Sequence, residues 1–226
     1  MSKTSVIEAK AIVFDADGTL FNSFELIVAS YKHISETHNL RVPTPDEIRL
    51  QLGNSLPDIF QDFYPEHNVL ELLKTNNAFM AANLMKSEAY EGLNEMLELL
   101  HDLGFKLAIL TSGGHNIVNV LKHHRIDKYF ASIVHHERIT KPKPDPEGFL
   151  LAAKECDVDA NESVMVGDTV NDVLVGKNAL SLATVAITHG YGNSDDLVKA
   201  GADYIVDSLS HFSDLAMTFQ GSKLVH

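Results

Sequence analysis

Two aspartates, Asp15 and Asp17, lie one residue apart at the end of a short apolar run near the N-terminus, and a Gly-Thr turn signal follows them. Two more, Asp168 and Asp172, follow a later apolar run and are separated by about one helical turn. Carboxylates about 4 Å apart repel each other by roughly 4 kcal/mol at an effective dielectric constant near 20. If the fold gathers these acids, a cation must accompany them.

These acids predict a magnesium site. Carboxylate oxygens without a cluster of Cys or His ligands favour a hard cation, and an open site that is shared with a phosphate favours Mg²⁺. We expect Asp15 and Asp168 to be the first ligands. Asp172 would bind through water or orient the other ligands, and Asp17 would add its backbone carbonyl oxygen.

The spacing of Asp15 and Asp17 predicts that the two acids have different roles. A cation keeps Asp15 ionised, so that its carboxylate can attack a phosphoryl group in line. The neighbouring charge raises the proton affinity of Asp17, which can protonate the departing alkoxide and later accept a proton from water. The pair therefore predicts a mechanism with an aspartyl-phosphate intermediate.

A transferring phosphoryl group also needs fixed hydrogen-bond donors and positive charge. Thr111 can offer its hydroxyl, Ser112 its backbone N–H, and a helix that begins near Gly113 its positive end. We expect Lys141 to supply the full charge. Lys143 competes for this role, but we interpret it as a solvent-exposed lysine.

The elements that must position these residues are short strands with helices between them. Most of the apolar runs are continuous rather than alternating, which is typical of parallel strands that are buried on both faces. The predicted strands are Ala11–Asp15, Lys106–Thr111, Ser132–His136, Ser163–Asp168, Thr184–Thr188 and Tyr204–Asp207. The predicted crossover helices are Gly92–Leu103, Asp145–Glu155 and Asn171–Leu180. This order predicts an α/β fold with an open parallel sheet that is covered on both faces, and ligands of such sheets bind beyond the carboxyl ends of the strands.

A helical insertion interrupts this order at residues 23–87, and residues 1–22 and 88–226 form the predicted core. Its predicted helices are Phe24–His38, Asp46–Leu52, Leu56–Phe63 and Val69–Met85. We expect the insertion to select the substrate. Arg49 and the turn that contains Asn54 are the candidates for contacting it, although Arg49 is equally consistent with a solvated helix residue.

The composition limits the partners. Against 18 basic residues stand 31 acidic ones, and the formal net charge of −13 opposes binding to nucleic acid or to an anionic membrane. The single cysteine, Cys156, fits a reducing compartment. Because the N-terminal residues lack an apolar signal core and no apolar run approaches the roughly 18 residues of a membrane span, we expect a cytoplasmic protein that is a monomer or a homodimer.

Taken together, the motifs resemble those of the haloacid dehalogenase superfamily of phosphatases. The matching positions are Asp15-x-Asp17-Gly-Thr, Thr111, Lys141 in Lys-Pro-Lys-Pro-Asp, and Gly-Asp168-x-x-x-Asp172. The resemblance implies a Rossmann-like core with a small all-helical cap domain, magnesium and an acyl-phosphate intermediate. A stretch beginning at His189, His-Gly-Tyr-Gly, is most similar to the phosphoglycolate phosphatase subgroup.

Three positions depart from the superfamily's usual pattern. Ala16 stands where phenylalanine is usual, Asn22 where an acid is common, and Glu91 where a proline is common. Asn22 and Glu91 lie where the chain enters and leaves the insertion, so they bear on cap closure rather than on the chemistry.

The leading hypothesis is a magnesium-dependent phosphatase that hydrolyses a small phosphorylated metabolite, with phosphoglycolate as the nearest candidate. A sugar phosphomutase of the same superfamily would use the same residues. A phospho-receiver switch also uses an acidic magnesium pocket with a Thr or Ser and a Lys. It needs no leaving-group acid, however, so Asp17 argues against it.

Overall fold

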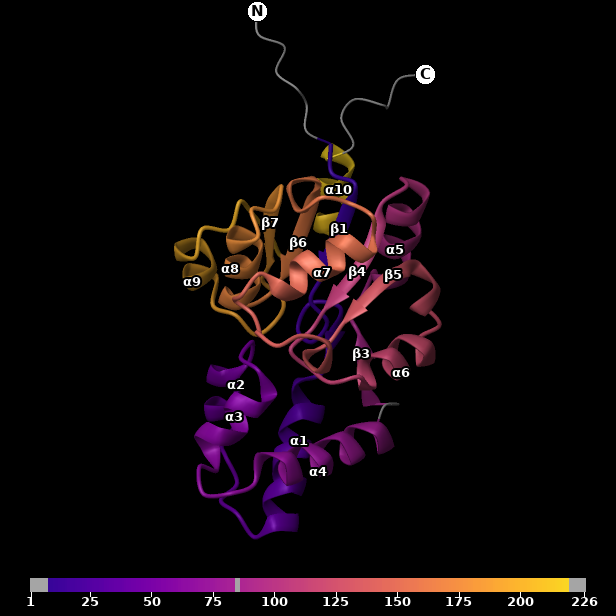
Figure 1. Cartoon of the computed structure of the whole chain (residues 1–226). Coiled ribbons are helices and arrows are strands. Elements are labelled where there is room, and N and C mark those ends of the chain that lie inside the picture. Colours follow the sequence, from indigo (N-terminus) through magenta and orange to yellow (C-terminus); the bar gives the residue numbers. More distant parts are fainter. Residues whose placement is uncertain (1–7, 84–85, 220–226) are drawn as a thin grey trace, which may run out of the picture.

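The computed structural model describes residues 8–83 and 86–219. Its main sheet has six parallel strands in the order β5-β4-β1-β6-β7-β8 (Figure 1). The strands are β1 (Ala11–Phe14), β4 (Lys106–Leu110), β5 (Phe130–Val134), β6 (Ser163–Gly167), β7 (Ala183–Ile187) and β8 (Tyr204–Val206). The predicted open parallel sheet is confirmed. Most of the strand ends differ from the predicted ones by one or two residues.

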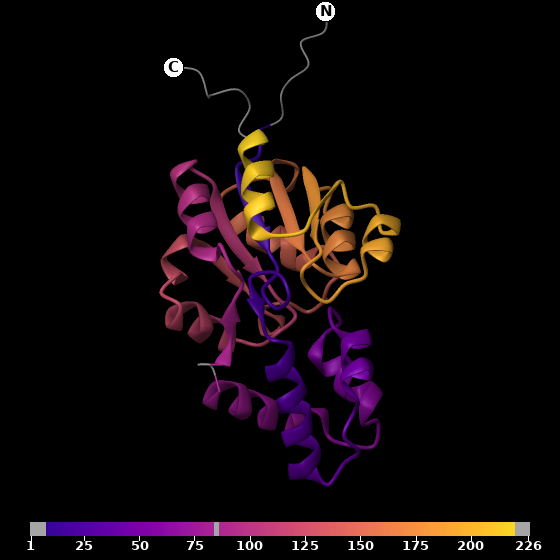
Figure 2. The same cartoon turned by 180° about the vertical axis from the view of Figure 1, so that it is seen from behind.

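Helices cover both faces of this sheet because successive strand residues point to opposite sides. Ile12 and Phe14 of β1 pack on one side, against α5 (Leu93–Asp102), α6 (Asn116–His123) and α10 (Leu209–Thr218). Ala11 and Val13 pack on the other side, with α7 (Glu147–Glu155) and α8 (Val170–Asn178). Figure 1 shows α7 in front of the sheet, and Figure 2, from behind, shows α10 over β1. The short α9 (Ser194–Lys199) packs beside α8.

Four helices follow β1 as an insertion with an apolar core of its own. They are α1 (Phe24–His38), α2 (Pro45–Gln51), α3 (Leu56–Phe63) and α4 (Val69–Ala82). Their core includes Tyr31, Ile34, Ile48, Phe60 and Leu72. Capping side chains start three of the helices at Thr44, Ser55 and Asn68. The predicted helix Val69–Met85 ends at Ala82 in the structure, and its last two residues lie outside the described ranges.

A two-stranded antiparallel ribbon joins this insertion to the sheet. β2 (Phe21–Asn22) carries the chain out and β3 (Glu88–Ala89) brings it back. Three short 3-10 turns, η2 (Asp127–Tyr129), η3 (His136–Arg138) and η4 (Ala160–Glu162), complete the elements. In the described part of the chain, no helix is both long and apolar enough to cross a membrane.

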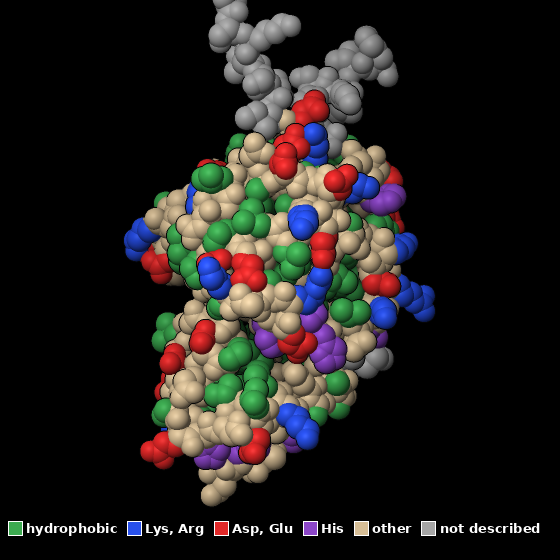
Figure 3. All heavy atoms as spheres, viewed as in Figure 1, with side chains coloured by type: hydrophobic (Ala, Val, Ile, Leu, Met, Phe, Trp, Pro, Cys, Tyr) green, Lys and Arg blue, Asp and Glu red, His purple; other side chains and the backbone are tan. Residues whose placement is uncertain are grey.

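The charged side chains are interspersed on the surface that faces the viewer in Figure 3. Lys and Arg appear singly among Asp and Glu on this face, and histidines gather where the larger part meets the smaller one.

Candidate active site

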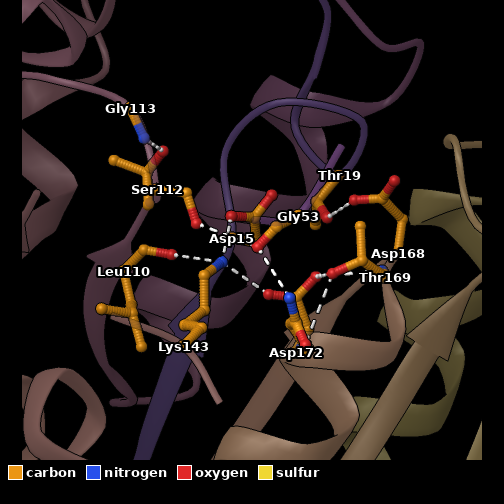
Figure 4. Close-up of polar contacts among 12 residues, drawn as sticks. Asp15, Thr19, Gly53, Leu110, Ser112, Gly113, Lys143, Asp168, Thr169 and Asp172 are labelled. Carbon is orange, nitrogen blue, oxygen red and sulfur yellow. Dashed lines mark hydrogen bonds and ion pairs between the residues drawn. The ribbon is translucent and has the colours of Figure 1, made fainter. Parts of the chain in front are cut away.

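Three aspartates meet at the carboxyl ends of the central strands. Asp15 directly follows β1, Asp168 directly follows β6, and Asp172 lies in the first turn of α8. Carboxylate oxygens of the three lie within 4.8 Å of one another (Figure 4). All three residues are buried, at 6%, 0% and 1% exposure respectively. The structure therefore brings together three of the four predicted metal ligands.

The lysine at this centre is Lys143. The sequence predicts Lys141 here, and this expectation is wrong because the structure places Lys143, two residues later, at the carboxylates. The Lys143 Nζ donates to Asp15 Oδ1 and to Asp172 Oδ1, each at 2.6 Å, and to the Leu110 carbonyl at 3.3 Å. The Lys143 side chain is only 3% exposed, whereas the Lys141 side chain is 69% exposed and lies 3.7 Å from Asp145.

The physical reason for this difference lies at the start of α7. Glu147 accepts hydrogen bonds from the backbone N–H groups of Thr140 and Lys141 and from the Thr140 hydroxyl. These bonds hold residues 140 and 141 at the surface. The chain then turns inward, and Lys143 is the residue that reaches the carboxylates.

Asp172 has a structural role at the beginning of α8. Thr169 is the N-cap, and Asp172 Oδ2 accepts from its backbone N–H at 2.9 Å and from its hydroxyl at 2.6 Å. The other oxygen, Oδ1, accepts from Lys143. Asp172 thus fixes both the helix start and the position of the lysine.

Asp168 is fixed by a different set of donors. Its Oδ1 accepts from the Thr19 hydroxyl at 2.9 Å, and its Oδ2 accepts from the Tyr191 N–H at 2.7 Å. Gly18 has a φ of +93° and packs so closely on Asp168 that a Cβ at this position would overlap the carboxylate. The glycine of the Asp-Gly-Thr signal is therefore required both by the turn and by the aspartate behind it.

The electrostatics of the trio show a shortage of positive charge. Burial, with added repulsion from Asp172 and Asp168, raises the pKa of Asp15 well above its ordinary value, although Lys143 opposes this. Burial and the charge of Asp172 raise the pKa of Asp168 to about 7. For Lys143, burial works against the charge, but Asp15 and Asp172 outweigh it and hold the pKa above its ordinary value. One lysine among three buried carboxylates leaves room for a further cation, and these hard oxygen donors suit Mg²⁺.

Asp17 lies apart from the trio, on the side where Thr111 and Gly113 are found. A Cβ added to Gly113 would be 3.3 Å from Thr111 Oγ1 and 3.6 Å from Asp17 Oδ2, so both side chains border this glycine. Thr111 Oγ1 accepts from the Gly113 N–H at 3.0 Å, which leaves its own proton free to donate. Burial raises the pKa of Asp17, against the opposing effects of Ser23 and Lys143. Its carboxylate is not among the grouped metal-ligand oxygens.

A cavity of about 140 Å³ lies between this edge of the sheet and the helical insertion. Asp15, Asp17 and Thr111 line its core side. Asp15 Oδ1 is bound by Lys143, whereas no hydrogen bond within the described residues occupies Oδ2. The free carboxylate oxygen of Asp15 therefore belongs to a residue that borders the cavity.

The insertion touches the core through its turn at Gly53 and Asn54. The Gly53 carbonyl accepts from Asn171 Nδ2 at 3.0 Å and from Ser112 Oγ at 3.3 Å, and Asn54 Oδ1 accepts from Asn171 at 3.1 Å. Asn54, Ser112 and Gly113 line the cavity, and their contact with a substrate stays a prediction. Arg49 does not line it, because its guanidinium stacks on the Phe24 ring at 4.0 Å.

Sequence reasoning missed two residues that the structure places at the site. Tyr191 fixes Asp168 through its N–H, and its hydroxyl accepts from the Ser23 N–H at 3.0 Å, where the insertion begins. Asn76 of α4 lines the cavity and is 7% exposed. The His-Gly-Tyr-Gly stretch was a signal for Tyr191, but the helical pattern around Asn76 offered none.

Comparison with known proteins fits this arrangement. The family described as haloacid dehalogenase-like hydrolase matches residues 12–186. The chain belongs to this family. This agrees with the resemblance of its motifs. The buried acids of this hydrolase lie at the carboxyl edge of a Rossmann-like sheet.

Its relatives include named phosphatases. Pyrophosphatase PpaX of Halalkalibacterium halodurans is 33% identical over 212 residues, which cover 92% of this chain and 97% of the relative. A phosphoglycolate phosphatase of Vibrio parahaemolyticus is 26% identical over 220 residues, which cover 92% and 96%. The crystal structure of a predicted phosphoglycolate phosphatase from Haemophilus somnus has the same fold, with a TM-score of 0.83 at 23% identity over 92% of this chain and 97% of that one.

Proposed function

We propose that this protein is a magnesium-dependent phosphatase that hydrolyses a small phosphate monoester through an aspartyl-phosphate intermediate on Asp15. One observation carries the proposal. Asp15 lies at the end of β1 with one carboxylate oxygen held by Lys143 and the other unoccupied by the described residues, beside a cavity that Asp17 and Thr111 also line. A buried carboxylate with a fixed and a free oxygen is suited to in-line attack.

In the first half of the reaction, Asp15 Oδ2 attacks phosphorus and the bond from phosphorus to the ester oxygen breaks. Asp17 gives its proton to the departing oxygen, and its raised pKa supports this role. Lys143 holds Oδ1 of Asp15 in place and balances part of the negative charge. The products of this half are the free alcohol and the phosphorylated Asp15.

In the second half, Asp17 is a carboxylate and accepts a proton from water. The hydroxide attacks phosphorus, the bond to Asp15 Oδ2 breaks, and inorganic phosphate leaves with Asp15 restored. The Thr111 hydroxyl, the Ser112 N–H and the N-terminus of α6 would stabilise charge on the phosphoryl oxygens.

Asp15, Asp168 and Asp172, with the Asp17 carbonyl, are the residues that would hold magnesium. When bound, Mg²⁺ supplies the positive charge that the trio lacks and polarises the phosphoryl group. Lys141 has no part in this proposal because its side chain is 69% exposed. Asp172 also orients Lys143 through Oδ1.

We assign residues 1–22 and 88–226 to a catalytic core domain and residues 23–87 to a cap domain. The separate apolar core of the four helices and the two-stranded ribbon at their base support this division. The partner is a small phosphorylated metabolite. Phosphoglycolate, predicted from the sequence, and pyrophosphate, from the name of the relatives, are the reference substrates against which others are compared.

We place the protein in the cytoplasm, since Cys156 is a free, buried thiol of the kind that a reducing compartment allows. Whether it is a monomer or a homodimer stays a prediction. A phosphomutase would return the phosphoryl group to a sugar, so a new sugar phosphate isomer in place of free phosphate would identify that activity.

The test is release of phosphate from p-nitrophenyl phosphate. We expect turnover that stops when EDTA removes the metal and returns when Mg²⁺ is restored. Asp15→Asn should lower kcat by at least about 10⁴-fold, because the nucleophile is lost. The matched control is Asp102→Asn, which changes a side chain that is 84% exposed and should keep full activity. Full activity in Asp15→Asn would overturn the proposal.

A further inference from the structure

The cap side of the cavity carries no charged residue in the described part of the chain and is largely apolar, with Ser30, Asn54, Asn76 and Asn77 as neutral polar members. Six of its lining residues come from the three helices α1, α3 and α4 and from the C-cap of α2, and their side chains are all hydrocarbon or thioether: Leu26, Ile27, Leu52, Leu56, Ile59 and Met80. The part of the substrate that leaves with the ester oxygen must lie against this wall, because Asp15 and Thr111 hold the phosphoryl end. The wall therefore has to match the chemistry of the alcohol.

The cavity lining contains no Lys, Arg or His among the described residues. Lys143 is bound to two carboxylates. The cap arginines are engaged elsewhere, since Arg41 donates to Glu47 and Arg49 stacks on Phe24. A second anionic group on the substrate that lies against the cap side would lose its hydration shell and find no positively charged side chain in exchange.

One neutral polar group does point to a ligand. Asn76 is only 7% exposed and lines the cavity, and no hydrogen bond to another described residue occupies its side-chain amide. The amide is reached from the cavity, and both its donor and its acceptor can bind a group of the substrate there. An uncharged hydroxyl, carbonyl or amide on the substrate would satisfy it.

The size of the cavity limits the alcohol further. It measures about 140 Å³, and it must hold the phosphate as well. A cavity of about 150 Å³ holds one benzene ring. A volume of this size suits the phosphate ester of a small alcohol better than it suits a nucleotide.

We infer that the substrate is a phosphate monoester of a small, uncharged alcohol with an apolar body and a neutral hydrogen-bonding group that contacts Asn76. This inference rests on the proposed phosphatase activity and narrows it. It places esters with a second negative charge, such as phosphoglycolate, and pyrophosphate among the poor substrates.

The test compares two substrates that differ only in charge. Phosphoglycolamide carries an amide where phosphoglycolate carries a carboxylate. We expect kcat/KM for phosphoglycolamide to exceed that for phosphoglycolate by about 100-fold, and also to exceed that for pyrophosphate. Equal rates, or a preference for phosphoglycolate, would overturn the inference while leaving the phosphatase activity intact. If p-nitrophenyl phosphate is not hydrolysed either, the proposed function is contradicted, and the inference fails with it.

Variants of cavity residues test whether the preference for phosphoglycolamide arises in the cavity. Met80→Lys should shift the ratio of the two rates toward phosphoglycolate, because it adds a cation to the apolar wall. The ratio is measured within one protein preparation, so partial unfolding does not affect it. Asn76→Ala should cost phosphoglycolamide about tenfold relative to propyl phosphate, which has no group for the amide.

Two controls complete the design. Asn83→Ala changes an asparagine that caps the same helix and bonds to the Phe79 carbonyl outside the cavity, so the ratio should not move. Arg49→Met should also leave the ratio of phosphoglycolamide to phosphoglycolate unchanged. A selective loss of phosphoglycolate hydrolysis in Arg49→Met would show that this arginine reaches the substrate and would contradict the inference.

Discussion

The two walls of the cavity, one from the core and one from the cap, differ in whether they contain charged side chains. On the core wall, Asp15 and Asp172 are buried around Lys143 at distances of 2.6 Å. On the cap wall, aliphatic side chains and neutral amides face the same space, and a charged pair such as Arg41 and Glu47 lies at the surface, with side chains 57% and 40% exposed. If the proposed function holds, the core supplies the chemistry and the uncharged cap wall disfavours substrates with a second charge.

The walls also differ in how they are built. The core residues stand at the ends of strands and the starts of helices, where backbone position fixes their direction. The cap residues stand on helix faces, and their direction depends on how four short helices pack around Tyr31 and Phe60. Changes in the core wall should therefore abolish activity, and changes in the cap should alter selectivity.

The largest expected effect separates the two lysines of the Lys-Pro-Lys-Pro segment. Lys143→Met should reduce kcat by about 10³-fold. It should also lower stability by about 3–5 kcal/mol, since it leaves two buried carboxylates without their partner. Lys141→Met should behave like the unmodified protein in both respects. Phosphate release and denaturant unfolding measure the two effects, and equal losses in both variants would contradict the assigned geometry.

Asp17→Asn should have the next largest effect, and the effect should depend on the leaving group. We expect about a 10²-fold loss with an alkyl phosphate, because the departing alkoxide then lacks its acid. Formation of the intermediate from p-nitrophenyl phosphate, whose leaving group needs no proton, should be much less affected. Pre-steady-state release of p-nitrophenol measures this step. An equal loss of this step with both substrates would exclude Asp17 as the general acid.

A smaller effect is expected at the contact between the walls. Gly53 has a φ of +96°, and a Cβ there would lie 2.9 Å from Thr169, so Gly53→Ala should hold the cap away from the core. We expect KM to rise by about tenfold. Gly104→Ala is the matched control, since its φ is +86° but no atom lies within 4 Å of the added carbon. Gly104→Ala introduces the same backbone strain and should leave KM unchanged. If KM rises similarly in both variants, the strain and not the contact with Thr169 is responsible.

The smallest effect concerns the surface charges of the cap. The hydrogen bonds from Arg41 and from the Thr44 N–H lower the pKa of Glu47 from 4.5 to about 2. Because the folded pKa is depressed, the stabilisation is present above about pH 4.5 and is lost as the pH falls toward 2. Glu47→Gln should lower the unfolding midpoint slightly at neutral pH and make little difference near pH 2.

Substrate selectivity should not change in Glu47→Gln. Glu36→Gln is the control, as Glu36 lies 3.9 Å from Lys32 on an exposed helix face. A midpoint difference in Glu47→Gln that persists unchanged at low pH would show that the carboxylate charge does not matter.

The core wall could be predicted from sequence because its residues follow recognisable strands. Ala11–Phe14 and Ser163–Gly167 are fully buried, apolar runs, and each is followed directly by an aspartate. The parallel sheet then places Asp15 and Asp168 at one edge without further information. The position of the lysine could not be predicted because Lys-Pro-Lys-Pro offers two equivalent lysines. The turn that decides which of them points inward depends on Glu147 of the following helix.

The cap wall was predictable only in outline. The four helices followed from their helical patterns, and the structure adds the caps Thr44, Ser55 and Asn68 that start three of them. The role of Arg49 depended on a tertiary contact, its stacking on Phe24, that no local pattern encodes. Asn76 was missed for the same reason, since a polar residue on a buried helix face is recognised only once the cavity beside it is known.

Trapping the phosphorylated enzyme tests the central claim most directly. The Asp17→Asn variant should form the intermediate from p-nitrophenyl phosphate but lack the base that hydrolyses it. Acid quench, proteolysis and mass spectrometry should then locate the phosphoryl group on Asp15. Release of p-nitrophenol with no phosphoryl group on Asp15, or with the group on Ser112 instead, would contradict the account.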